Sequence, residues 1–299
     1  MSQKKNKLNK ADWRVWVIFL PGIAFVLLFT IYPIVKMFVM SFFDWNIGFQ
    51  QSSPFIGLKN YIDVITDPIA KIAIVNTFVY ALVTVPLQMI IGLGVALLIN
   101  NIKKFNLTFR LGYYLPVITS WVVVALLFRY IFANTGLINY LLVDVFKVTN
   151  DPVRWLSSRW SALSSAMLLG IWKGIGWNMI IFLAALQAVP KHLYEAADID
   201  GASRLQKFRF ITLPSIRGTI TFALIMLSIG AFNTYTPIAI LTGGNPMHQT
   251  EVVLTWMYFQ TFDALNMGYS AALSIIVTII IMVVTILVFG ISNRKKVTR

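Results

Sequence analysis

Long apolar segments separated by short polar ones dominate the chain. A helix that crosses a bilayer needs about 20 mostly apolar residues, because the hydrocarbon core is roughly 30 Å thick and each residue rises about 1.5 Å. Six segments meet this requirement, so the pattern predicts an all-α, polytopic membrane protein with six transmembrane helices. The predicted spans are approximately Val15–Met40, Ile72–Ile99, Leu111–Phe132, Ala162–Leu186, Ile216–Leu241 and Met267–Ile291.

The composition supports a membrane protein without any motif. Of the 299 residues, 58% are hydrophobic and 12% are charged, whereas a soluble domain carries about 25% charged residues. The chain has no cysteine, which excludes disulfides, zinc–thiolate sites and thiol nucleophiles. The basic N-terminal segment runs into the first span without a small-residue cleavage site, so we expect that span to be retained.

The positive charges predict the orientation of the spans. With the N-terminus inside, seventeen Lys and Arg residues fall on the inner side and five on the outer side. Cytoplasmic loops are the ones enriched in Lys and Arg. We therefore predict cytoplasmic tails at residues 1–14 and 294–299 around a transmembrane domain at 15–293. This topology accounts for the net charge of +14, and no nucleic-acid partner is needed.

A polar island between the fourth and fifth predicted spans is the most informative segment. Pro190 suits the first turn of a helix, and residues 191–200 then form a short predicted helix. Gly201 can adopt the left-handed conformation that ends such a helix, and Ser203 can cap a second one. The sequence predicts a compact, sharply turned cytoplasmic element over residues 190–214.

The island also carries a family motif. The run Glu195-Ala196-Ala197, then Gly201, then Ile211-Thr212-Leu213-Pro214 resembles the EAA loop of bacterial ABC-importer permeases. The resemblance implies a type I ABC-importer permease fold in which this loop docks onto an ATPase subunit. The positions that it assigns to ATPase coupling are Glu195, Ala196, Ala197, Gly201, Arg209, Leu213 and Pro214.

Further motifs extend the resemblance over most of the chain. They are similar to the first of the two permeases in carbohydrate importers of the maltose or glycerol-phosphate type. They are Phe29–Pro33, Ser41–Trp45, Gly57–Tyr61, Gly268–Leu273 and Leu241–Pro246, in which Asn245 stands where the family more often has a third glycine.

The resemblance implies a specific assembly. The chain would be the permease subunit of a binding-protein-dependent ABC importer in the bacterial cell (inner) membrane, forming half of the path for a sugar or sugar derivative. Its partners would be a second, different permease, ATP-binding subunits and an extracytoplasmic solute-binding protein. No cofactor or enzymatic activity is implied. The chain lacks a Gly-rich loop followed by Gly-Lys-Ser or Gly-Lys-Thr, so we expect ATP hydrolysis in a separate subunit.

Lys173 lies near the middle of the fourth predicted span, where a charge costs about 2.5–3.5 kcal/mol on the insertion scale. One interpretation is a substrate path, in which Trp172 and Trp177 stack on sugar rings and Lys173 or Asn178 donates to hydroxyl groups. The alternative is structural: Lys173 binds a backbone carbonyl or reaches the interface, and nearby glycines let a helix approach closely.

A polar cluster interrupts the fifth predicted span. Asn233, Thr234 and Tyr235 precede Pro237, which leaves a backbone carbonyl free. A water-filled cavity satisfies such a cluster, so these residues are candidates for the substrate path. Contacts between helices are an equally good interpretation.

Other functional classes leave weaker signals. The segment Glu251–Phe262 is too short to span the membrane and is predicted at the outer interface, as a docking site for the binding protein or as an amphipathic surface helix. His192 and His248 are predicted on opposite sides of the membrane, so no metal site is expected. The predicted spans contain no carboxylate for a proton relay. A stand-alone secondary transporter of small polar solutes remains the alternative.

Overall fold

The computed structural model describes residues 13–45, 53–102 and 104–293. Lys103 and nearly all of the two predicted basic tails lie outside these residues. The chain divides into two compact units, Met1–Val64 with Gln260–Ile275 and Ile65–Phe259 with Ile276–Arg299. A single transmembrane domain at 15–293 stays a prediction.

Five of the predicted spans are present in the described residues as apolar helical segments of sufficient length. These are Ile18–Met40, Pro68–Asn101, Arg159–Gln187, Arg217–Leu241 and Met267–Ile291. The first consists of α1 (Trp13–Val26), the π-helical segment η1 (Leu27–Ile31) and α2 (Tyr32–Met40). The others are α4 (Pro68–Asn101), α8 (Arg159–Gln187), α12 (Arg217–Phe232) with α13 (Thr236–Leu241), and α15 (Met267–Asn293).

The third span is not the single helix predicted at Leu111–Phe132. It consists of α5 (Asn106–Ile118) and α6 (Trp121–Ile131), which meet at 92°. Thr119 and Ser120 between them adopt extended conformations. Pro116 in the last turn of α5 has no N–H to donate, which weakens the helix there. Hydropathy depends only on composition and does not detect such a bend.

In the first unit, three of the sequence motifs come together. The Asn60 side chain, on α3 (Lys59–Thr66), donates hydrogen bonds to the carbonyl oxygens of Ser41 and Phe43, each at 2.9 Å. The Ser41 hydroxyl lies 2.7 Å from the Tyr61 hydroxyl. A Cβ atom at Gly268 would overlap the Phe43 carbonyl oxygen. The motifs around residues 41–45, 57–61 and 268–273 therefore form one packed junction.

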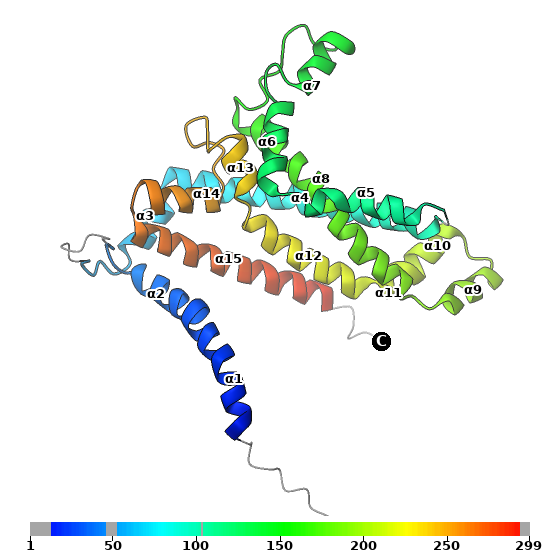
Figure 1. Cartoon of the computed structure of the whole chain (residues 1–299), viewed down its shortest axis with the longest axis horizontal. Helices are drawn as coiled ribbons and strands as arrows, with labels where there is room; N and C mark the ends of the chain where they lie inside the picture. The colour runs from blue at the N-terminus through cyan, green and yellow to red at the C-terminus, as the bar shows by residue number, and fades with distance from the viewer. Residues whose placement is uncertain (1–12, 46–52, 103, 294–299) are drawn as a thin grey trace, which may run out of the picture. The chain divides into compact units, whose positions relative to one another are not determined.

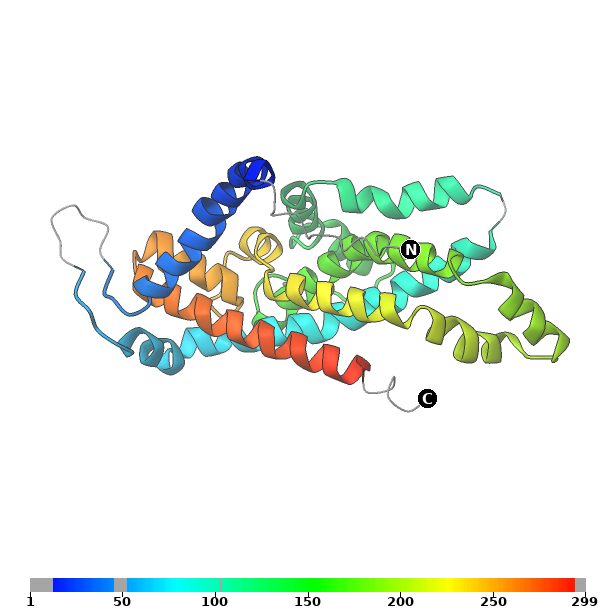
Figure 2. The same cartoon turned by 90° about the horizontal axis from the view of Figure 1, so that it is seen from below.

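The second unit is built around the long helices α4 and α8, with α12 and α5 packed against them (Figures 1 and 2). Small residues allow these close approaches, as is usual between membrane helices. A Cβ atom at Gly170 would overlap the Tyr80 hydroxyl, and one at Gly174 would overlap the Gln88 amide. A Cβ atom at Gly176 would overlap the Tyr113 carbonyl oxygen of α5.

The contact at Gly176 gives a first prediction. Gly176→Ala should lower the stability of the protein in detergent by about 1–3 kcal/mol, because the backbone of α5 has to move away. Gly94→Ala is the matched control: its Cβ atom meets nothing within 4 Å, and alanine favours a helix interior by about 0.5–1 kcal/mol over glycine. Thermal unfolding of both variants measures the difference. Equal midpoints would show that α5 does not depend on this glycine.

The segment predicted at the outer interface is more buried than expected. Its first helix, α14 (Val253–Tyr258), buries Val253 and Trp256 and packs against α4. The Asn76 side chain of α4 donates to the carbonyl oxygens of Gln249 and Glu251, at 2.9 and 2.7 Å. Because its apolar face is covered and its approach is held by these bonds, α14 is a packed part of the unit and not an amphipathic surface helix.

Candidate functional site

The polar island folds as the sequence predicts. It forms α9 (Lys191–Ile199), α10 (Arg204–Lys207), the π-helical segment η3 (Phe208–Thr212) and α11 (Leu213–Ser215), which leads into α12. Gly201 has φ +73°, in the left-handed region. The Ser203 side chain accepts a hydrogen bond from the Gln206 N–H while the Gln206 side chain accepts from the Ser203 N–H, which is a complete capping box. We call residues 190–214 the elbow.

Two further contacts brace the elbow. The Tyr194 hydroxyl of α9 lies 2.9 Å from the Thr212 hydroxyl at the far end of the turn. Lys207 of α10 forms an ion pair with Asp198 of α9. Because both contacts join the two arms across Gly201, the elbow can move as a rigid body.

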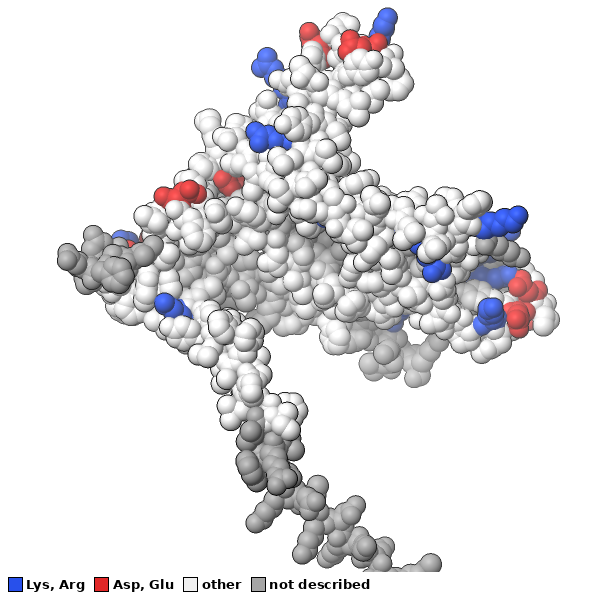
Figure 3. Space-filling model, in the orientation of Figure 1, with Lys and Arg blue, Asp and Glu red and all other residues white. Residues whose placement is uncertain are grey.

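The outer surface of the elbow is unusual for a protein surface in water. Large apolar side chains of Ile199, Leu205 and Phe210 are 88%, 73% and 69% exposed. Charged side chains gather beside them at this end of the second unit, whereas most of the surface of its long helices is uncharged (Figure 3). Contiguous exposed apolar groups rimmed by polar ones mark interaction surfaces. Of the predicted coupling residues, Glu195, Ala196, Gly201, Arg209 and Pro214 are exposed, and Ala197 and Leu213 are half-buried.

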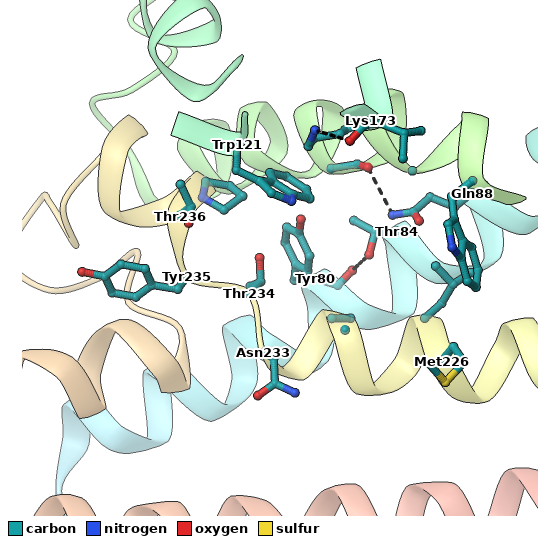
Figure 4. A pocket seen from close by; sticks show the side chains of 18 residues that line it. Tyr80, Thr84, Gln88, Trp121, Lys173, Met226, Asn233, Thr234, Tyr235 and Thr236 are labelled. Atoms are coloured by element: carbon teal, nitrogen blue, oxygen red, sulfur yellow. Dashed lines mark hydrogen bonds between the residues drawn. The ribbon is translucent and has the colours of Figure 1, made fainter. Parts of the chain in front are cut away.

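A cavity of about 560 Å³ lies in the second unit, where the third and fifth spans are interrupted. Trp121 contributes to it from the first turn of α6, directly after the bend. Thr234 and Thr236 contribute from the break between α12 and α13 (Figure 4). The helices α4 and α8 supply the remaining polar groups. Interruptions of spanning helices occur where backbone lines a cavity instead of facing lipid.

The structure brings five of the seven predicted path residues to this cavity. They are Lys173, Trp177, Asn233, Thr234 and Tyr235. The other two, Trp172 and Asn178, are not among its lining residues. The Trp172 ring packs on Phe128, with ring centroids 5.7 Å apart, and Asn178 is fully buried and donates to the Gly174 carbonyl oxygen at 2.9 Å.

Of the three from the fifth span, only Thr234 directs its polar group into the cavity (Figure 4). The Thr234 hydroxyl points into the cavity beside Tyr80 (Figure 4). Asn233 points away and donates to the Ile229 carbonyl oxygen of its own helix at 2.9 Å. The Tyr235 ring also points away and packs on Tyr258, with centroids 5.2 Å apart.

Lys173 is buried, and its ammonium group is held by backbone. Nζ donates hydrogen bonds to the carbonyl oxygens of Pro116 at 2.6 Å, Thr119 at 2.5 Å and Val117 at 3.3 Å. The same atom lies over the Trp121 ring, 4.9 Å from its centroid. Of the two interpretations of Lys173, these contacts favour the structural one, in which it binds backbone carbonyl groups. Lys173 joins α8 to the bend between α5 and α6.

Sequence reasoning missed three residues on α4 that line the cavity. Tyr80, Thr84 and Gln88 are all buried and follow one another at intervals of four. Asn76 continues the same stripe toward the N-terminal end of the helix. Residues four apart lie on one face of a helix. A polar stripe inside an apolar span could therefore have been recognised from the sequence as a candidate cavity lining.

These features define a class of protein. A membrane-embedded helical subunit with two interrupted spans around a polar cavity, and a rigid elbow beyond the ends of its spans, is the architecture of a solute-transport component. Residues 73–297 match the family described as "Binding-protein-dependent transport system inner membrane component". The chain belongs to this family.

Individual relatives agree with the family. The chain is 34% identical over 284 residues to the arabinooligosaccharides transport system permease protein AraP of Bacillus subtilis (strain 168), covering 92% of this chain and 87% of AraP. It is 29% identical over 289 residues to the lactose transport system permease protein LacF of Rhizobium radiobacter, covering 95% and 96%. A chain in the crystal structure of a bacterial ABC transporter involved in import of the acidic polysaccharide alginate matches with a TM-score of 0.82 at 25% identity, covering 97% and 98%.

Proposed function

We propose that this chain forms one half of the translocation path for a carbohydrate in a binding-protein-dependent ABC importer, and that the elbow couples the path to an ATPase subunit. The observation that carries the proposal is the cavity between the two interrupted spans. Its walls combine aromatic faces with hydroxyl and amide groups. Ligand pockets have this character, and about 560 Å³ falls within the roughly 300–1,000 Å³ that is usual for them.

A sugar suits this lining. The rings of Trp121 and Trp177 offer apolar faces to the C–H surface of a pyranose. Tyr80, Gln88 and Thr234 offer donors and acceptors to its hydroxyl groups. The named transport substrates of AraP and LacF are likewise carbohydrates. The sequence motifs of the first carbohydrate permease support the same assignment.

The elbow is the proposed attachment point of the ATPase. Its side chains Ile199, Leu205 and Phe210 are apolar and exposed. On the cytoplasmic side, beyond the lipid, a protein partner has to bury them. Glu195 is exposed beside them and has no ion-pair partner in the described part of the chain. A partner cleft that buries the apolar groups and supplies a donor to Glu195 would grip the elbow, and the braces across Gly201 would pass its movement to α8 and α12.

The rest of the assembly follows from this role. ATP hydrolysis takes place in the separate ATPase subunits. A second permease supplies the other half of the path, and a solute-binding protein delivers the sugar from outside. The excess of Lys and Arg on one side of the spans supports cytoplasmic termini and a cytoplasmic elbow.

The two tryptophans of α8 test the cavity as a sugar path. Trp177→Ala should lower sugar uptake about tenfold, since losing one stacking face costs on the order of 1.4 kcal/mol. Trp172→Ala is the matched control, because Trp172 lies on the same helix but outside the cavity lining, and it should keep most of the activity. Initial uptake rates in proteoliposomes that hold the whole importer measure both. Similar losses in both variants would count against the cavity as the path.

A further inference from the structure

The charge of Lys173 bears on which solutes the cavity can bind. It is the one charged residue among the described residues that line the cavity. A free ammonium group there would attract acidic sugars, such as uronates, and would do so strongly at low dielectric. The contacts of Lys173 decide whether its charge is free.

The hydrogen-bonding capacity of Lys173 is fully used by this chain. An ammonium group has three N–H donors, and three carbonyl oxygens of the α5 end accept them. The Trp121 ring covers a further face of the group. Because all three donors are bonded within the chain, none remains to be offered to a solute.

The partners of Lys173 also offset its charge. The carbonyl groups in the last turn of a helix have no intrahelical donors, and the helix end carries a partial negative charge of about half an elementary unit. The electron-rich face of an indole ring attracts a cation as well. The charge of Lys173 therefore stabilises the bend between α5 and α6.

The groups that do face the cavity are neutral. Tyr80 and Thr234 direct their hydroxyl groups into it (Figure 4). Gln88 and Thr84 also line it, and they donate to the carbonyl oxygens of Gly170 at 3.3 Å and Tyr80 at 2.7 Å. Lys173 is bonded to carbonyl groups at the end of α5. No carboxylate lines the cavity within the described residues. A neutral lining with both donors and acceptors matches hydroxyl groups and offers nothing to balance a buried charge.

We infer that Lys173 is a positioning residue that holds the α5–α6 bend, and that the cavity takes uncharged, hydroxyl-rich solutes in preference to acidic ones. The inference rests on the proposed function of the cavity as the sugar path. It separates this chain in substrate class from the alginate transporter, which imports an acidic polysaccharide.

A cysteine in the cavity measures its electrostatic potential directly. The chain has no native cysteine, and a side chain at Gly230, which lines the cavity, meets nothing within 4 Å. Gly230→Cys in the complete ATP-free importer would be labelled with an anionic and a cationic methanethiosulfonate of similar size. The ratio of the two rates is compared with that for 2-mercaptoethanol, and the importer without the substitution gives the background.

We expect the ratio of the anionic to the cationic labelling rate at Gly230→Cys to lie within about threefold of the ratio for 2-mercaptoethanol. Adding Lys173→Met or Lys173→Gln should change this ratio by less than about twofold. Gln88→Lys provides the benchmark: a free cation in the cavity should raise the anionic rate at least about tenfold, as expected for a unit charge within roughly 10 Å at an effective dielectric of about 20. If neither neutral variant of Lys173 assembles, Gly230→Cys alone decides the question against this benchmark.

Two different results would overturn the inference, and they can be told apart. An anion preference of about tenfold that Lys173→Met abolishes would show that the charge is free and that the cavity favours acidic solutes, with the proposed path intact. Failure of Gly230→Cys to react with either reagent, with or without Gln88→Lys, would show that water does not reach the cavity. That second result would remove the proposed path itself.

Discussion

Gly201→Val should lower ATP-driven uptake at least about tenfold, while Gly201→Asn keeps most of it. Gly201 has φ +73°, and a Cβ atom there meets nothing within 4 Å, so the cost of a side chain is conformational and not steric. The left-handed conformation costs an ordinary residue about 1–2 kcal/mol. It is least favourable for β-branched residues and best tolerated by asparagine. Valine therefore favours an opened turn, in which the contacts Tyr194–Thr212 and Asp198–Lys207 no longer hold the two arms together.

Two measurements separate this effect from general damage. Uptake into proteoliposomes reports transport, and the amount of ATPase subunit that co-purifies with the tagged chain reports docking. Both should fall together for Gly201→Val, while the thermal stability of the membrane helices stays near that of the unchanged protein. Normal uptake by Gly201→Val would mean that the shape of the elbow does not matter for coupling.

Lys173→Met is expected to have the second large effect. It removes the donor to three backbone carbonyl groups at the end of α5, and each unsatisfied buried acceptor costs about 1–3 kcal/mol. The free energy of unfolding in detergent should therefore fall by about 3 kcal/mol or more. Uptake should fall for every sugar tested, because the bend that places Trp121 is no longer held.

The same substitution at another lysine is the control. Lys36 of α2 has one contact with an aromatic ring, its Nζ atom lying 5.8 Å from the centroid of Trp45. Lys36→Met should therefore cost only about 0.5–1 kcal/mol. Lys173→Arg keeps the charge and the donors and should recover part of the lost stability. If Lys173→Met unfolds like Lys36→Met, the carbonyl contacts do not hold the bend.

The elbow is the part that the sequence predicted best. Its Gly201 and Ser203 act through local backbone chemistry, which depends on neighbouring residues alone, and both lie at the structural positions that the sequence predicted. Pro190, predicted in the first turn of the helix, lies one residue earlier, as the N-cap of α9. Five spans were likewise predicted because length and apolar character suffice to define them. The third was predicted as one helix because hydropathy does not sense a bend at Thr119 and Ser120.

The cavity was harder to predict for a physical reason. Position along a span shows that Trp172, Lys173 and Trp177 lie at similar depth, but not which of them faces a neighbouring helix. The partners of Lys173 are 54 to 57 residues away in the chain, so its tertiary contacts were not accessible from spacing. The stripe Tyr80–Thr84–Gln88 was accessible, because it lies on one helix at regular intervals.

The most direct test of the whole account is purification of the tagged chain in mild detergent, followed by identification of the subunits that come with it. We predict a second six-span permease and an ATPase that carries a phosphate-binding loop. We predict further that Gly201→Val removes the ATPase and retains the second permease. A chain that purifies alone, and behaves the same with Gly201→Val, would contradict the account and favour a stand-alone secondary transporter.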